Sequence, residues 1–99
     1  MAWTNNRLTV LGSEAQVRRF QESTWDRRLR ARHCELLETS PTRLACQFDT
    51  EGPLLEPLRG LSRRWPRLTF LLSYEGETKR IIGVAKAKAG QVEHWETSY

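Results

Sequence analysis

Hydrophobic and polar residues alternate along much of this chain, and the period of the alternation changes several times. The segment 7–12, "RLTVLG", alternates and is rich in Leu, Thr and Val, which predicts a strand closed by a glycine. Ser13 follows at a helix N-cap position with Gln16 three residues later, a capping box that predicts a helix start. The expected apolar face of this helix consists of Ala15, Val17, Phe20 and Thr24.

The end of this first helix has two solutions. It breaks near Ser23 and Thr24, or it continues through residues 25–32, "WDRRLRAR", where Trp25 and Leu29 would extend the apolar stripe. The pattern leaves both open.

Residues 33–51 predict a β-hairpin that turns around Thr39, Ser40 and Pro41. Leu44, Cys46 and Phe48 give its second strand one apolar face, and Cys34 and Leu36 have the same parity on its first strand. Two registers keep both apolar sets on one face. One register sets Cys34 opposite Cys46 and the other separates them, so pairing of the two thiols stays open, with reduced thiols as the default in a cytoplasmic chain.

A second helix is predicted over residues 53–65, because leucines recur at helical spacing up to Trp65. Pro53 suits its first turn, or the regular helix begins at Pro57 with Glu56 as its cap. Pro66 ends it, since the residue before a proline avoids helical geometry. Three strands are expected afterwards, over 68–75 ("LTFLLSYE"), 80–90 ("RIIGVAKAKAG") and 91–99 ("QVEHWETSY").

The resulting order is strand, helix, strand, strand, helix, strand, with one or two further strands. It predicts an α+β domain over residues 1–99 with a ferredoxin-like split βαβ (βαββαβ) antiparallel sheet, two helices on one face and a C-terminal β extension. The chain has 99 residues, of which 38% are hydrophobic and 28% charged, an ordinary composition for one soluble domain. The start "MAWTNNRLTV" lacks the layout of a signal peptide and no apolar run is long enough for a membrane span, so we expect a cytoplasmic protein.

Catalytic chemistry is not expected. His33 and Cys34 are neighbours on a predicted strand, so their side chains point to opposite faces and cannot act as a nucleophile and its base. The two cysteines and two histidines do not have the spacing of a metal site. We therefore predict no catalytic residue, no metal and no cofactor.

Charge carries the main functional signal. Residues 18–32 hold six arginines against two acidic residues, and residues 59–67 hold four arginines against none. The net charge of the chain is only +4, so the rest of it is acidic and the two clusters create a directional field that favours anionic partners.

Two kinds of partner suit these arginines. Exposed tryptophan beside arginine is typical of protein–protein hot spots. The chain is therefore predicted to bind a protein partner through Trp25, Arg27, Arg28, Arg30, Arg63, Arg64 and Arg67. The alternative is nucleic acid bound through phosphate contacts of the same arginines. Base stacking of the RNA-recognition type is disfavoured, because Phe48 is the only aromatic in the predicted first and third strands and is assigned to the core.

Oligomeric state is left open by the sequence. The C-terminal strands can pair across a homodimer as edge strands, with Lys86 and Lys88 opposing uncontrolled pairing.

Three stretches resemble a known family in their order: "MAWTNNRLTVLG", "FDTEGPLLEPLRGLSRRWPRLTFLLSYEG" and "GVAKAKAG". They are similar to the YubB and Api-type proteins, small plasmid- and phage-borne proteins that carry a ferredoxin-like domain and bring no established activity. The family usually has a tryptophan after the threonine that ends a strand, where this chain has Glu51 after Thr50. The resemblance implies the fold and a role as a mobile-element accessory or inhibitor that acts by binding.

Overall fold

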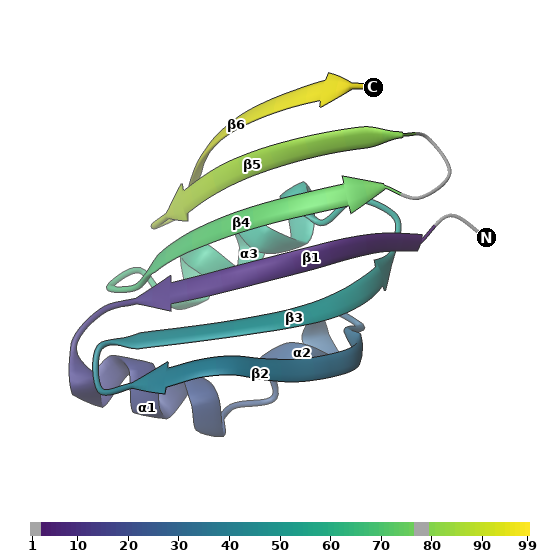
Figure 1. Cartoon of the computed structure of the whole chain (residues 1–99). Coiled ribbons are helices and arrows are strands. Elements are labelled where there is room, and N and C mark those ends of the chain that lie inside the picture. Colours follow the sequence, from purple (N-terminus) through teal and green to yellow (C-terminus); the bar gives the residue numbers. More distant parts are fainter. Residues whose placement is uncertain (1–2, 77–79) are drawn as a thin grey trace.

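The computed structural model describes residues 3–76 and 80–99, and these form two layers, a six-stranded antiparallel sheet with helices on one of its faces (Figure 1). The strands are β1 (Trp3–Leu11), β2 (Arg32–Ser40), β3 (Arg43–Glu51), β4 (Thr69–Gly76), β5 (Ile81–Lys88) and β6 (Gln91–Ser98). The helices are α1 (Glu14–Glu22), α2 (Trp25–Arg28) and α3 (Leu55–Arg64). The strand order across the sheet is β2-β3-β1-β4-β5-β6.

The α+β class and the antiparallel sheet agree with the prediction, but the two-helix ferredoxin-like fold is wrong. The described chain has three helices, and β5 and β6 continue the sheet beyond β4 to give six strands. The extra helix arises because α1 stops at Glu22, where both the backbone N–H and the hydroxyl of Ser23 donate to the Phe20 carbonyl. The chain then makes one further helical turn, α2, so the first of the two possible helix ends is the correct one.

Aromatic side chains hold the core between the sheet and the helices. Phe20 of α1 stacks on Trp25 of α2 at a centroid distance of 5.3 Å. It also meets Trp65 and Phe70 edge-on, at 5.4 and 5.5 Å. Phe48 is buried as predicted and contacts Trp25 at 5.6 Å. The ring of Phe20 in α1 thus contacts α2, the C-cap of α3 and strand β4, and it lies at the centre of the packing between helices and sheet.

The first strand is longer than predicted, because it begins at Trp3 and not at Arg7. Asparagine is uncommon in strands, which hid the start of β1, yet Asn6 is fully buried there. Its side-chain amide donates to the Thr50 hydroxyl at 2.9 Å on the neighbouring strand β3, which satisfies a donor that burial would otherwise leave unpaired.

The β2–β3 hairpin forms, but its first strand has no buried apolar face. Leu36 pairs with Cys46, so Cys34 does not face Cys46, and the pairing shifts on either side of Leu36. Cys34 is exposed, Cys46 is buried, and both are free thiols. β2 lies at the sheet edge, and its residues are exposed up to the partly buried Ser40.

The remaining predicted boundaries fall close to their observed places. The Ser13 hydroxyl accepts from the Gln16 N–H at 3.3 Å, as expected for an N-cap. Helix α3 starts before Pro57 and ends with Trp65 as its C-cap, next to Pro66. Ala15 and Thr24 are exposed, so the apolar face of α1 is narrower than predicted.

The outermost strand on the β4 side is β6, so Lys86 and Lys88 of β5 lie inside the sheet and do not guard an edge as predicted. Within the described ranges, none of the helices has the length and apolar character needed to cross a membrane.

Candidate functional site

The helical face carries the residues predicted to bind a partner, and Trp25 is not accessible there. Only 7% of Trp25 is exposed, and its ring is enclosed by Phe20 and Phe48. The expectation that it is a partly exposed anchor beside the arginines is wrong. The physical reason is that α1 ends at Ser23, and the chain then turns so that Trp25 of the short helix α2 faces the core.

The predicted arginines are all exposed, and two of them come together. Arg28 of α2 and Arg64 of α3 line the same hollow of about 510 Å³, together with the chain between α1 and α2. They also share a smaller hollow of about 170 Å³ that reaches Gly60. Arg28 and Arg64 are 36 positions apart in the sequence, so the two arginine clusters adjoin on the helical face through these two residues.

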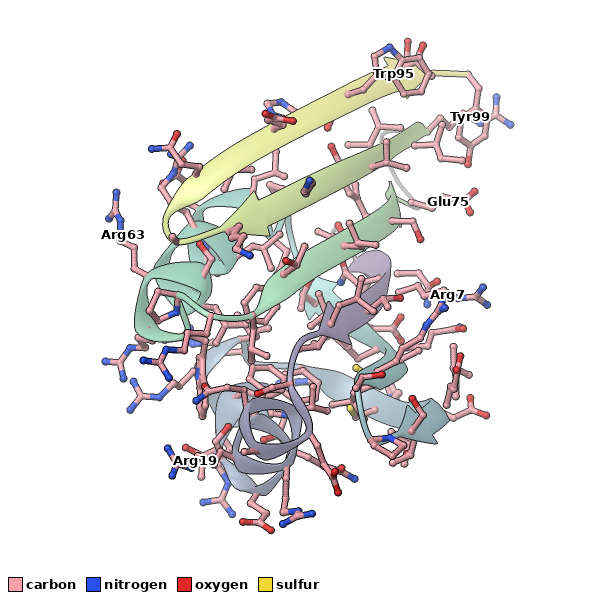
Figure 2. All side chains as sticks on the ribbon, turned by 90° about the vertical axis from the view of Figure 1, so that its left-hand side faces the viewer. Arg7, Arg19, Arg63, Glu75, Trp95 and Tyr99 are labelled. Atoms are coloured by element: carbon pink, nitrogen blue, oxygen red, sulfur yellow. The ribbon has the colours of Figure 1, made fainter. Side chains whose placement is uncertain are left out.

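The other predicted arginines do not line these hollows. Arg27 lies in α2, Arg30 follows α2 and Arg67 follows α3, and all three are exposed. The aliphatic stem of Arg63 lies over Gly90 in the β5–β6 turn. A Cβ added to Gly90 would lie 2.8 Å from Cγ of Arg63. Figure 2 shows Arg63 and Arg19 on the helical side of the molecule, and Arg7, Trp95 and Tyr99 on the other side.

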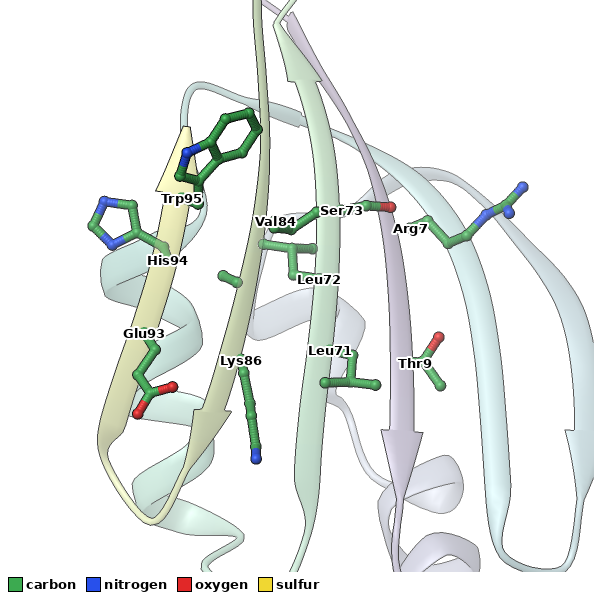
Figure 3. Close-up of a pocket in the computed structure, with 11 residues that line it drawn as sticks. Arg7, Thr9, Leu71, Leu72, Ser73, Val84, Lys86, Glu93, His94 and Trp95 are labelled. Carbon is green, nitrogen blue, oxygen red and sulfur yellow. The ribbon is translucent and has the colours of Figure 1, made fainter. Parts of the chain in front are cut away.

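The opposite face of the sheet is covered by no described element, and it was missed as a site by sequence reasoning. Its main feature is a shallow hollow of about 540 Å³ over β1, β4, β5 and β6 (Figure 3). One row of cross-strand neighbours runs through it, in the order Arg7, Ser73, Val84, Trp95. Trp95 leans over β5 from the edge strand, whereas the side chain of His94 points away from the hollow.

Apolar side chains are unusually exposed on this face. Val84 is 51% exposed and Trp95 is 62% exposed, and the side chains of Leu71 and Ile82 beside them are exposed as well. These four residues, Leu71, Ile82, Val84 and Trp95, are called the sheet-face patch below. An antiparallel sheet that is covered on one side normally turns polar residues outward, so the sheet-face patch needs an explanation.

The polar surroundings of the sheet-face patch are asymmetric. Arg7 lies at its border, and no ion pair joins Arg7 to any acidic residue among those the structure describes. Lys86 and Glu93 are cross-strand neighbours at the opposite side of the hollow. Two cations without an ion pair among the described residues thus flank the patch, Arg7 from the centre of the sheet and Lys86 from β5.

Beyond Arg7 the open face becomes polar. Asp49 of β3 accepts a hydrogen bond from the Asn5 side chain at 3.0 Å, and the ring nitrogen Nδ1 of His33 lies 3.2 Å from its other oxygen. Arg32 lies over the Trp3 ring at 5.4 Å. These polar groups contact one another, whereas Arg7 borders the apolar hollow without an ion pair among the described residues.

The alternation of the sequence held a signal for this surface. Leu71 and Trp95 lie within the strands predicted over 68–75 and 91–99, and the structure places both on the open face. A count of apolar residues at the outward positions of neighbouring strands would have found the patch, provided that the strand order was known. That order, with β5 and β6 extending beyond β4, is a tertiary property.

The thiols have the properties of inert groups. Burial raises the pKa of the Cys46 thiol to about 12, with a smaller contribution from Cys34. Burial and the nearby Asp26 carboxylate raise the pKa of Cys34. Both thiols are therefore protonated near neutral pH and are poor nucleophiles. Among the described residues, no group of three or more His, Cys, Asp or Glu side chains is arranged to hold a metal ion.

Comparison with protein-family models, with curated proteins and with solved structures gives no match for this chain. The resemblance to the YubB and Api-type proteins stays a prediction, and the function has to be argued from the two faces of the molecule.

Proposed function

We propose that this protein is a non-enzymatic binding module that holds a protein partner on the open face of its sheet. The observation that carries the proposal is the sheet-face patch, a group of exposed apolar side chains in three adjacent cross-strand rows over three neighbouring strands. Exposed apolar surface of this kind marks interaction sites in soluble proteins. A small binder without chemistry of its own acts as an accessory or an inhibitor, the role that the resemblance implies.

Trp95 is the expected anchor of this interface. Tryptophan, tyrosine and arginine dominate the binding energy of protein interfaces because they bury large areas and also offer polar groups. Trp95 and Arg7 lie in the same cross-strand row, with Val84 and Ser73 between them. This replaces the predicted pairing of tryptophan with arginine at Trp25, which is buried in the core.

The chemistry of the patch defines the partner. An apolar side chain of the partner fits the hollow between Leu71, Val84 and Trp95, where its burial contributes about 25 cal/mol for each Å² removed from water. A carboxylate beside this apolar side chain would pair with the guanidinium of Arg7. Such a charge-assisted hydrogen bond is stronger than one between neutral groups and would add to the binding energy. The proposed partner is therefore a protein that presents an apolar side chain flanked by acidic residues.

A capture experiment with two matched variants tests this proposal. Val84→Glu places a charge in the patch, and Leu36→Glu places the same charge at an exposed leucine of the β2 edge, which is 55% exposed compared with 51% for Val84. Each purified protein is immobilised and exposed to an extract of its own cells, and bound proteins are identified by mass spectrometry. We expect a partner that the wild type and Leu36→Glu retain and that Val84→Glu loses.

The captured partner is then titrated calorimetrically against the three proteins. Val84→Glu should raise Kd at least tenfold, which corresponds to about 1.4 kcal/mol. Equal binding by all three folded proteins, or an equal loss in both variants, contradicts docking on the sheet face.

A further inference from the structure

The helical face has a charge that the proposed function does not use. The helical segments 13–31 and 54–67 together contain nine arginines and four acidic residues, a net charge of +5, whereas the whole chain has +4. Two of the four carboxylates, Glu14 and Glu56, are within ion-pair distance of Arg18 and Arg59. The other seven arginines form no ion pair with any acidic residue in the described part of the chain.

Helix capping explains only part of this charge. Arg63 and Arg64 are in the last turn of α3, and Arg27 and Arg28 are in the last turn of α2, where positive charge interacts favourably with the backbone carbonyls. That effect acts on each helix separately. It does not require the C-terminal ends of two helices to meet at one hollow, and the like charges of Arg28 and Arg64 oppose such an arrangement.

The shared hollow has donors suited to phosphate oxygens. Its lining includes the guanidinium-bearing residues Arg28 and Arg64 and the hydroxyl residue Thr24, whereas the Ser23 hydroxyl in the same lining already donates to the Phe20 carbonyl. The Thr24 side chain makes no capping hydrogen bond to α2, so its hydroxyl is not consumed by the helix. Glu22 is the one acidic residue of this lining. Arginine forks and hydroxyl groups are the side chains that most often contact nucleic-acid phosphates.

We propose that the helical face binds the phosphate backbone of double-stranded nucleic acid, with Arg28 and Arg64 at the centre of the contact. A single strand is disfavoured because its binding normally uses exposed aromatic rings for base stacking. On this face Trp25 is buried and Trp65 is partly buried against Phe20. An acidic protein is disfavoured too, because the apolar side chains that would anchor it here belong to the core.

This inference is independent of the sheet-face proposal, because the two surfaces lie on opposite sides of the sheet (Figure 2). Contacts to phosphates alone carry no sequence information, so the binding should be independent of sequence and steeply dependent on salt. Each arginine that leaves the contact should lower the slope of log K against log salt by about one.

Fluorescence anisotropy with a labelled duplex DNA of mixed sequence, recorded over a series of salt concentrations, tests the inference. The double variant Arg28→Gln/Arg64→Gln should lower the salt slope by about two. Arg7→Gln is the matched control, since Arg7 is also an exposed arginine without an ion pair among the described residues but lies on the opposite face. It should leave the slope unchanged.

Three results would overturn the inference. The first is no duplex binding by the wild type at low salt. The second is an equal loss of slope in Arg7→Gln and in the double variant, which would indicate non-specific attraction to net charge. The third is tighter binding to the corresponding single strand, or equally effective competition by polyglutamate, which would assign the face to another polyanion. Circular dichroism of each variant confirms that the fold is retained.

Discussion

Tyr74, Gly83 and Glu96 are cross-strand neighbours on β4, β5 and β6, and each explains the others. Gly83 has no side chain, and the space over it is occupied by the Tyr74 ring. The ring reaches across β5 so that the tyrosine hydroxyl donates to the Glu96 carboxylate at 2.7 Å. The cross-strand register identifies Tyr74 as the residue that approaches Gly83 closely.

Substitution of Gly83 by alanine should destabilise the protein. The new Cβ would lie 2.3 Å from Cζ of Tyr74, so the buried ring has to move and its hydrogen bond to Glu96 is strained or lost. Overpacking of this kind costs about 1–3 kcal/mol. Urea denaturation measures the free energy of unfolding.

Gly60→Ala is the control for this substitution. Gly60 lies inside α3, and a Cβ added there meets nothing within 4 Å. Because alanine is a better helix former than glycine, we expect Gly60→Ala to stabilise the protein by up to about 1 kcal/mol. Destabilisation of similar size in both variants would contradict the tight contact between Gly83 and Tyr74.

The ionisation of Tyr74 should be strongly delayed. Burial of its ring, followed by its hydrogen bond to the Glu96 carboxylate, raises the pKa of Tyr74 from 10.0 to about 12. The neutral tyrosine is favoured in the folded protein, so its contribution to stability is complete below pH 10 and is lost as the pH rises toward about 12. Tyr99, the second of the chain's two tyrosines, is replaced by Phe so that phenolate absorbance reports Tyr74 alone.

The folded Tyr99→Phe protein should then titrate near pH 12 and the urea-unfolded protein near pH 10. In Glu96→Gln the hydrogen bond to a carboxylate is removed while burial remains, so the midpoint should fall between these values. Titration of the folded protein near pH 10 would contradict the buried hydrogen bond. Circular dichroism recorded in parallel shows the pH range in which the fold persists.

At the scale of elements, α2 decides which tryptophan is available to a partner. This four-residue helix, Trp25–Arg28, is too short to show a helical period in the sequence. Its tryptophan is surrounded by charged residues and therefore resembles a surface residue. The hydrogen bonds that end α1 at Ser23 reset the direction of the chain, and this brings Trp25 onto Phe20.

Replacement of Trp25 by alanine should cost about 3–5 kcal/mol of unfolding free energy, as expected for a large aromatic removed from a core. Trp95 is 62% exposed, and Trp95→Ala should change stability by no more than about 0.5 kcal/mol. Chemical denaturation of both variants compares them directly. If Trp95→Ala were as destabilising as Trp25→Ala, the sheet-face patch would be part of the core and not a free surface.

Features of the other elements that depend on neighbouring residues in the sequence were predicted, and features that depend on remote residues were missed. The Ser13 cap, the stop at Pro66 and the alternation of β4 depend on neighbouring residues, and the structure confirms them. The polar start of β1 was missed because the side-chain amide donor of Asn6 is satisfied by Thr50, which is remote in sequence. The register shifts of β2 were missed because periodicity cannot reveal a bulge in an exposed edge strand.

At the scale of the whole molecule, both candidate surfaces arise from the two-layer arrangement. Alternation identified the residues that face away from the core, but it could not show that β4, β5 and β6 carry an uncovered face. Composition identified two arginine clusters, but only the packing of α2 beside α3 brings Arg28 and Arg64 to one hollow. In both cases the side chains could be predicted from the sequence and their neighbours could not.

The opposite placement of the two surfaces separates their tests. A charge at Val84 leaves the arginines of the helical face in place, and loss of Arg28 and Arg64 leaves the sheet-face patch intact. One proposal can therefore fail while the other stands. If both hold, the molecule joins a protein to a nucleic-acid duplex across a single sheet.

The position of β1 has a consequence for how the chain is made. Of the described strands β1 is synthesised first, yet it lies in the interior of the sheet and its two neighbours, β3 and β4, are both made later. Until residue 76 has left the ribosome, one edge of β1 has no native partner, and at about 5–20 residues per second this wait lasts for seconds. A nascent chain that stops before β4 therefore exposes the unpaired edge of β1, the strand that contains the apolar residues Leu8 and Val10. Such a chain is the form most in need of a chaperone.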